Sequence, residues 1–215
     1  MNLIELVESK TNLPTNLKIS AYDELLKYKG DDNVFIHFSD ISMVSLYPDA
    51  KYRTPVGIYG YPLNATWLYY KVDQSKSFKN YPQGHRKFIH IFKVNKLNKL
   101  LNANNYHNAK EDIEKLIKIY SDIDIYGEWG WLSQKHYNQF QLFWEITKFI
   151  AKQLDKKNYE QKWSGVIKKL GYNGVIETKP SGLIFGSEPI QMFIFSRGDI
   201  ELIDFIKNAD YKGKK

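Results

Sequence analysis

A chain of 215 residues with 43% hydrophobic and 26% charged residues has the composition of an ordinary soluble globular protein. It contains no cysteine, which excludes disulfides, thiol nucleophiles and cysteine-ligated zinc. A net charge of +7 favours polyanionic partners such as nucleic acid or nucleotide phosphates, although the lysines are spread along the sequence as on a solvated surface. Residues 1–10 match neither a signal nor a transit peptide, and no run of about 18 apolar residues indicates a membrane span. We therefore expect a cytoplasmic protein with no membrane partner.

The first half of the chain predicts strands. Residues 1–33 alternate short helical patterns with turn signals, so we expect a lead-in packed on an edge of the core. Apolar, β-branched and aromatic runs predict strands at residues 34–38, 66–72 and 87–94, and residues 54–59, with a proline and a glycine, predict the entry into another aromatic strand. In the run 87–94, His90 shares a face with Phe88 and Phe92, which favours a satisfied strand histidine over a metal ligand. Residues 95–108, with six asparagines, predict an irregular excursion.

The second half predicts helices and then short strands. Apolar residues at helical spacing predict helices over about 109–120, 134–154 and 160–170. Gly171 then stands where a left-handed C-terminal cap is needed. We expect the aromatic, glycine-broken segment 123–132 to form a loop over a cleft. Three short strands are expected at about 174–178, 183–185 and 191–195, before an amphipathic helix through Ile200, Ile203, Phe205 and Ile206.

These elements predict an α+β fold, with strands at both ends of the chain and helices between them. Residues 34–215 contain no internal repeat and no linker, so we expect one domain with residues 1–33 packed on it. Sequence motifs for dinucleotide-binding folds, P-loops, zinc proteases and serine-hydrolase elbows are missing. The histidines at 37, 85, 90, 107 and 136 lack metal-ligand spacing, so no metal site is predicted.

Three separated motifs remain. The first is His37-Phe38-Ser39 at the end of a strand; the second is Gly57-Ile58-Tyr59 with Tyr70 further along; the third is the segment 186–191, which contains Glu188 and Gln191 and precedes an apolar strand. In this order they resemble the ADP-ribosyltransferase superfamily, in the branch whose signature is His, Tyr and Glu on three strands. Residues 170–176, LGYNGVI, are similar to a segment of many bacterial and phage relatives. The resemblance covers residues 34–206.

The resemblance implies a split mixed or antiparallel β core with surrounding helices. It implies an enzyme that uses NAD as co-substrate and transfers ADP-ribose to a macromolecular acceptor, protein or nucleic acid, with release of nicotinamide. A toxin or phage effector would fit such a family. Breaking the bond between nicotinamide and ribose builds positive charge at the anomeric carbon, which a nearby carboxylate stabilises in a site with little water.

The resemblance also assigns roles to residues. Glu188 accepts a hydrogen bond from the ribose 2′-hydroxyl and stabilises the cation, and with His37 and Tyr59 it forms the catalytic triad. Tyr59 and Tyr70 sandwich the nicotinamide, while His37 holds a hydroxyl of the adenosine ribose. Ser39 holds the carboxamide or the adjacent ribose. Phe38 and Gln191 complete the expected NAD-binding set.

The residues leave alternatives open. A lone histidine in an apolar strand is usually a core residue, Tyr59 would ordinarily be a strand aromatic, and Glu177 competes with Glu188 for the carboxylate role. Phe38 stands where relatives often carry glycine, and Gly186 replaces the acid or amide of arginine-modifying relatives. Two other functions remain: a non-catalytic protein that binds NAD or a partner, such as a host-factor inhibitor, and an NAD-dependent RNA 2′-phosphotransferase, which needs a basic phosphate pocket.

Overall fold

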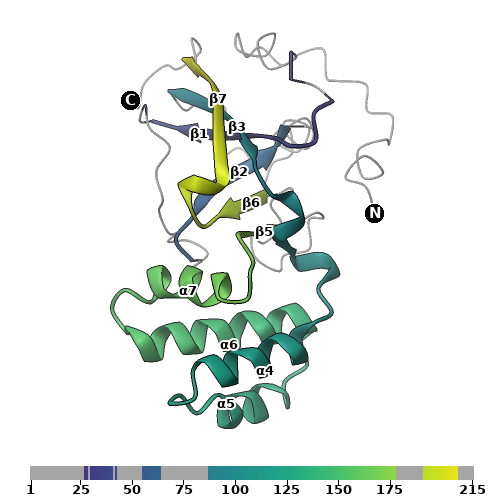
Figure 1. The fold of residues 1–215 in the computed structure, drawn as a ribbon, viewed down its shortest axis with the longest axis vertical. Coiled ribbons are helices and arrows are strands. Elements are labelled where there is room, and N and C mark those ends of the chain that lie inside the picture. The colour runs from purple at the N-terminus through teal and green to yellow at the C-terminus, as the bar shows by residue number, and fades with distance from the viewer. Residues whose placement is uncertain are drawn as a thin grey trace, which may run out of the picture.

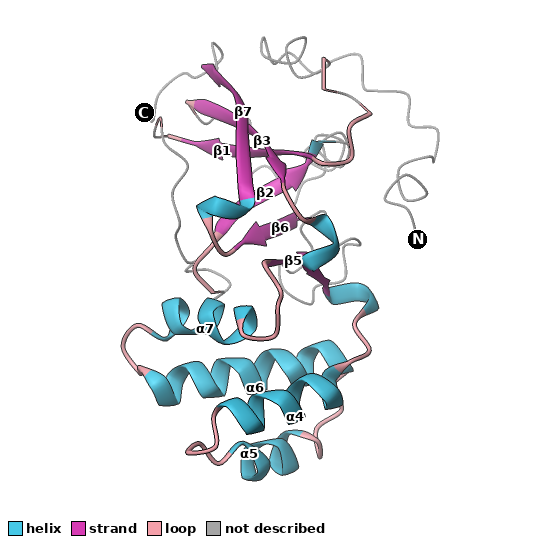
Figure 2. Cartoon of the chain, viewed as in Figure 1, coloured by secondary structure: helices cyan, strands magenta, loops and turns pink. Residues whose placement is uncertain are grey.

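The computed structural model describes residues 27–28, 30–40, 42, 55–63, 87–177 and 191–207. These residues form an α+β fold in which a seven-stranded open sheet lies next to a layer of four helices (Figures 1 and 2). Among the described elements, strands come first and last and the helices come between them, as the sequence predicts. The predicted α+β class is therefore confirmed for the described part of the chain.

The sheet brings together strands that are far apart in the sequence. Its order is β4-β5-β6-β2-β1-β3-β7, and each neighbouring pair is antiparallel except β4 and β5, which are parallel. The strands are β1 (Val34–Ser39), β2 (Ile58–Pro62), β3 (Phe88–Val94), β4 (Leu100–Asn102), β5 (Gly174–Glu177), β6 (Gln191–Ile194) and β7 (Ile200–Lys207). Short 3-10 turns occupy Leu97–Lys99, Ala103–Asn105 and Arg197–Asp199. The central strand β2 thus lies between β1 and β6, and β6 comes more than 120 residues later in the sequence than β2.

The pairing between β1 and β2 is short. It joins Phe35 to Pro62 and Ile36 to Tyr61 and then stops, whereas β1 continues to pair with β3 as far as Ser39. The two strands therefore separate at the level of His37. Beyond Ile36 the contact between β1 and β2 includes a hydrogen bond from the His37 side chain to the backbone of β2.

The helices pack on one face of the sheet. They are α4 (Ala109–Ile119), α5 (Ile125–Leu132), α6 (Gln139–Leu154) and α7 (Tyr159–Lys168). Their apolar sides share the larger core with Tyr59, Val175 and Phe193 from that face. A smaller cluster, which includes Phe35 and Met192, lies on the other face. The buried stripe of α6 contains a fully buried Thr147, whose hydroxyl accepts a hydrogen bond from the Trp163 indole of α7 at 2.9 Å.

The predicted helices are confirmed with changes at their ends. α4 and α7 match the prediction within two residues. α6 begins later than predicted because Asn138 caps it, with its side chain accepting from the Gln141 backbone while the Gln141 side chain accepts from the Asn138 backbone. Gly171 has φ of +91° and its N–H bonds to the Lys168 carbonyl at 2.9 Å, which confirms the predicted left-handed cap.

The prediction of a loop at 123–132 is wrong, because residues 125–132 form α5. Asp124 caps the helix by accepting from the Gly127 N–H at 2.9 Å. Ile125, Trp129 and Leu132, at helical spacing, turn toward the core, and this burial outweighs the cost of two helical glycines. The helix packs on α6, on the side away from the sheet (Figure 1).

The predicted terminal helix is also wrong, because residues 200–207 form the edge strand β7 beside β3. The register jumps from Ile91 opposite Asp204 to Phe92 opposite Leu202, so Ile203 is an extra residue on β7. Such a bulge interrupts the two-residue alternation by which a strand is recognised. In the stretch predicted to be irregular, residues 100–102 form β4. The strands predicted at 66–72 and 183–185 lie outside the described residues.

The described end of the N-terminal lead-in contacts β7. The Lys27 ammonium and the Tyr28 hydroxyl both donate to Asp204 Oδ2, at 2.6 and 2.7 Å. Together these donors lower the pKa of the Asp204 carboxyl to about 2. Within the described residues, no helix has the length and apolar character that crossing a membrane requires.

Candidate functional site

His37 sits at the point where β1 and β2 separate. Its ring is buried, with 5% of the residue exposed, and Nδ1 lies 2.6 Å from the backbone carbonyl oxygen of Tyr59. A carbonyl oxygen only accepts hydrogen bonds, so Nδ1 carries the proton and donates. In the neutral imidazole this fixes the tautomer and leaves the acceptor lone pair on Nε2.

The side chains of His37 and Tyr59 lie on opposite faces of the sheet. Ile36 is directly opposite Tyr61, so these two share a face, and the alternation of strand side chains places Tyr59 on that face and His37 on the other. The Tyr59 ring stacks on Phe193, with centroids 5.4 Å apart, and its hydroxyl donates to the Pro55 carbonyl at 2.9 Å. The structure therefore joins the two residues through the Tyr59 backbone.

The segment before β2 is held closely against its neighbours. The Val56 N–H donates to the Glu160 carbonyl of α7 at 3.0 Å. A Cβ at Gly57 would lie 3.0 Å from the Ile194 carbonyl oxygen, closer than ordinary van der Waals contact, so glycine lets β2 approach β6. The glycine of the Gly-Ile-Tyr motif thus has a packing reason in this chain, and it fixes how Tyr59 enters the sheet.

His90 lies next to His37 on the neighbouring strand. The two residues are register partners, with ring centroids 5.9 Å apart, and the other side of the His90 ring faces Phe205 at 5.2 Å. His90 is completely buried, in line with the prediction that it belongs to the strand's packing. No group of three or more His, Asp or Glu suited to hold a metal ion occurs among the described residues.

The remaining predicted site residues are described only in part. Ser39 ends β1, half-buried, opposite Phe88 of β3. Phe38 and Gln191 are described as strand residues of β1 and β6, without their side chains. Tyr70 and Glu188 lie outside the described residues, so their predicted roles stay predictions. The competing carboxylate, Glu177, is buried in β5 opposite Gln191.

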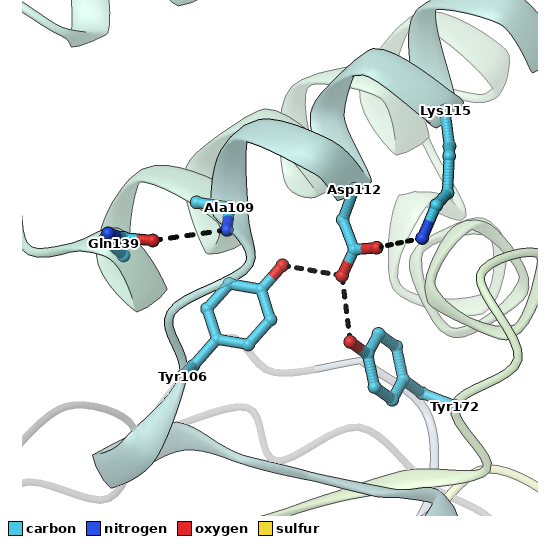
Figure 3. Close-up of polar contacts among 6 residues, drawn as sticks. All are labelled: Tyr106, Ala109, Asp112, Lys115, Gln139 and Tyr172. Atoms are coloured by element: carbon cyan, nitrogen blue, oxygen red, sulfur yellow. Dashed lines mark hydrogen bonds and ion pairs between the residues drawn. The ribbon is translucent and has the colours of Figure 1, made fainter.

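A buried carboxylate that the sequence analysis missed lies between the helices and β5 (Figure 3). Asp112 of α4 is 2% exposed. Its Oδ2 accepts hydrogen bonds from the hydroxyls of Tyr106 and Tyr172, both at 2.8 Å, and its Oδ1 faces the Lys115 ammonium at 2.9 Å. Burial, together with the Asp112 charge, raises the pKa of both tyrosines above their ordinary value.

This carboxylate anchors the LGYNGVI segment. Tyr172 belongs to that segment, directly before β5, so its hydroxyl ties the start of the strand to α4. Next to it, the Ala109 N–H at the start of α4 donates to the Gln139 side chain of α6 at 3.3 Å. Asp112 therefore has a structural role, in which it links α4 to Tyr106 and Tyr172. In the sequence, its position beside Ile113 and Leu116 on the apolar side of the helix indicates that it is buried.

Comparisons of the chain with protein-family models, curated proteins and solved structures give no match.

Proposed function

We propose that this protein is an NAD-dependent mono-ADP-ribosyltransferase of the His-Tyr-Glu type, with an ADP-ribosyltransferase-like core. The observation that carries the proposal is the order of the central strands, β6-β2-β1. The three motifs are widely separated in the sequence, yet the His37 motif ends β1, the Gly-Ile-Tyr motif leads into β2, and the third motif ends at Gln191, the first residue of β6. Glu188 stands three residues before the first residue of β6, and this strand pairs directly with the strand of Tyr59.

His37 supports the proposal through its tautomer. The Nδ1–H is used by the Tyr59 carbonyl, so the atom that accepts a hydrogen bond in the neutral ring is Nε2. A ribose hydroxyl is a donor suited to this atom, in keeping with the role that the resemblance assigns to His37. The hydrogen bond to Tyr59 and the position on β1 hold the His37 ring in one tautomer and one orientation, which is the kind of preorganisation that a binding site requires.

Tyr59 supports the proposal through its backbone. Its carbonyl orients His37, and its buried ring and hydroxyl hold β2 against Phe193 and Pro55. We assign Tyr59 a positioning role on this geometry. The resemblance also implies that Tyr59 and Tyr70 stack on the nicotinamide. Because the Tyr59 ring packs on Phe193 on the face opposite to His37, the proposal leaves this stacking to Tyr70.

The chemistry assigned to the chain needs one carboxylate. In the reaction the bond between nicotinamide and ribose breaks, nicotinamide leaves, and a nucleophile of the acceptor bonds to the anomeric carbon after losing its proton. Glu188 accepts the ribose 2′-hydroxyl hydrogen bond and stabilises the developing positive charge. Removing one such preorganised group lowers the rate on the order of a hundredfold or more.

The test is nicotinamide release and intact-mass analysis after exposure to NAD, with wild type compared with Glu188→Gln. The matched control is Glu177→Gln, which makes the same neutral replacement at the competing carboxylate. We expect wild type to release nicotinamide and to add the mass of ADP-ribose to an acceptor, and Glu188→Gln to lose both. Equal release by wild type and Glu188→Gln would remove Glu188 from the mechanism, and thermal stabilisation by NAD without release would favour a non-catalytic binding protein.

A further inference from the structure

The lysines are spread along most of the sequence but concentrate in one segment of the helical layer. Residues 148–169, from the second half of α6 through α7 and its C-cap, contain seven lysines and two acidic residues, a net charge of +5 out of +7 for the whole chain. We name this the α6–α7 basic surface. Its lysines are Lys148, Lys152, Lys156, Lys157, Lys162, Lys168 and Lys169.

The outward side of α7 is free of acidic residues. Its exposed positions, with the C-cap, are Gln161, Lys162, Gly165, Lys168 and Lys169. Lys162 and Lys169 are seven residues apart, close to two helical turns, and so align along the helix axis with about 10 Å between them. Gly165 lies between them, and among the described residues no atom comes within 4 Å of the place of its Cβ, so this part of the chain leaves room for a ligand that bridges the lysines.

Most of these ammonium groups are not neutralised by the described part of the chain. Lys148 faces Glu145 at 3.6 Å, and no carboxylate among the described residues lies within ion-pair distance of the other six. Asp155 is engaged in the turn between the helices, where it accepts from the backbone N–H groups of Lys157 and Asn158 at 3.0 and 3.1 Å. The hydrogen bonds from Asn158 lower the pKa of Asp155.

The residues around these lysines favour one class of negatively charged ligand among membranes, proteins and nucleic acids. A helix that binds a membrane needs an exposed apolar face. Trp163, Val166 and Ile167 of α7 are fully buried in the core, and Leu154 at the end of α6 is a single exposed large apolar side chain within 148–169. Protein interfaces need a desolvated centre with aromatic or apolar anchors, and the outward side of α7 offers lysine, glutamine and glycine. A ligand with repeated phosphates and no need for apolar contact fits this surface, since backbone phosphates supply most of non-specific nucleic-acid affinity.

We propose that the α6–α7 basic surface binds the phosphate backbone of nucleic acid without sequence preference. Binding requires neither NAD nor the catalytic residues, so it stands apart from the proposed transferase activity. α7 contacts the segment that precedes β2, because the Val56 N–H donates to the Glu160 carbonyl at the start of the helix. A role of the bound nucleic acid as acceptor rests in addition on the proposed function.

The test is fluorescence anisotropy of a labelled mixed-sequence DNA duplex and of a labelled RNA, titrated with the full chain without NAD at several salt concentrations. The test variant is the triple change Lys162→Gln, Lys168→Gln and Lys169→Gln. The matched control is Lys96→Gln, Lys110→Gln and Lys118→Gln, which removes the same charge from exposed positions away from α7. Figure 1 shows α6 lying between α7 and α4, which carries two of the control lysines.

We expect the test variant to bind the nucleic acid at least about tenfold more weakly than wild type. The affinity falls with rising salt concentration, and we expect the plot of log affinity against log salt concentration to become less steep by about one for each lysine removed. The control variant should keep the wild-type affinity and slope. Equal losses in both variants would show that net charge alone acts, and undetectable binding by wild type would overturn the proposal. Tighter binding to anionic phospholipid vesicles or polyglutamate than to the duplex would assign the surface to another partner. Because no NAD is present, a failed transferase assay leaves this result unaffected.

Discussion

The Nδ1–H of His37 donates to the backbone carbonyl of Tyr59 across a distance of 2.6 Å, at the point where β1 and β2 stop pairing. A side chain of β1 thus donates a hydrogen bond to the backbone of β2. Because both groups are buried, the hydrogen bond has two consequences. It holds the separated strands together, and it fixes which ring nitrogen is the acceptor.

The two consequences can be separated by substitution at His37. In His37→Asn the side-chain amide supplies a donor near the Nδ1 position but has no counterpart of Nε2. We expect the free energy of unfolding to stay within about 1 kcal/mol of wild type, while NAD binding weakens roughly tenfold, the worth of one hydrogen bond. Urea denaturation and calorimetric titration with NAD provide the two measurements.

His37→Leu is the matched comparison, because it removes both nitrogens and leaves the Tyr59 carbonyl buried without this donor. Leaving a buried polar group unsatisfied costs about 1–3 kcal/mol, so we expect this variant to lose that much stability as well as NAD binding. If His37→Asn bound NAD as tightly as wild type, the proposed use of Nε2 would be wrong.

The local elements of this region could be predicted from the sequence, but the arrangement of these elements in space could not. The strand containing His37, the turn before Tyr59 and the strand after Glu188 could all be recognised locally, from apolar runs and from glycine and proline. The position of β6 beside β2 could not, since it depends on pairing between segments more than 120 residues apart. The opposite orientation of the His37 and Tyr59 side chains follows only from the register of Ile36 with Tyr61.

The two misassigned segments have local patterns that mislead. The two glycines and the aromatic residues of α5 made the segment look like a loop. Ile125, Trp129 and Leu132 nevertheless recur at helical spacing, and their packing on the core that includes α6 stabilises the helix. In β7, the extra residue Ile203 breaks the alternation of the strand. Both elements are specified by their neighbours in space, as is common when tertiary packing overrides local propensity.

Asp112 should be among the most sensitive positions for stability. Asp112→Ala removes the acceptor of two tyrosine hydroxyls and leaves these donors in a buried setting, so we expect a loss of about 2–5 kcal/mol in the free energy of unfolding. Asp112→Asn keeps one acceptor oxygen and should lose less. Urea denaturation measures both.

Lys115→Gln is the control for the charge in this cluster. The Lys115 side chain is 59% exposed, and an exposed partner of this kind contributes at most about 1 kcal/mol. Should Lys115→Gln destabilise the protein as much as Asp112→Ala, the ion pair rather than the tyrosine hydrogen bonds would account for the effect.

The same cluster predicts a loss of stability in alkali. Burial, followed by the influence of Asp112, raises the pKa of Tyr106 and Tyr172 above the ordinary value of 10.0. Above pH 10 the unfolded chain releases these phenolic protons while the folded chain retains them, so the folded state binds more protons and stability falls as pH rises. The loss reaches up to about 1.4 kcal/mol per pH unit for a fully protected tyrosine, and less for the half-buried Tyr172.

Denaturation curves at several pH values between 8 and about 11 test this prediction. We expect Tyr106→Phe to be less stable than wild type at pH 8, because Asp112 loses a donor, but to lose stability less steeply above pH 10. Tyr126, which is 66% exposed on α5, gives the control variant Tyr126→Phe. Parallel curves for wild type and Tyr106→Phe would show that this phenol does not govern the alkaline transition.

Three glycines predict a graded series when each is replaced by alanine. Gly165 is an exposed helical position with open space at its Cβ, so alanine should stabilise the protein by about 0.5–1 kcal/mol. Gly171 also has open space but a φ of +91°, so alanine should cost about 1–2 kcal/mol through backbone strain alone. At Gly174 a Cβ would collide with the Phe193 carbonyl of β6, and because this is backbone we expect about 3 kcal/mol.

The order of the three unfolding midpoints is the measurement, with unchanged circular dichroism as the check that each variant folds. The series separates helix propensity, backbone conformation and strand packing, since each substitution adds the same methyl group. Gly174→Ala also tests the sheet, because Gly174 lies between Leu100 of β4 and Ile194 of β6 in the register of β5. If alanine were tolerated at Gly174 as well as at Gly165, the close approach of β5 and β6 would be wrong, and with it the placement of the LGYNGVI segment beside the strand that follows Glu188.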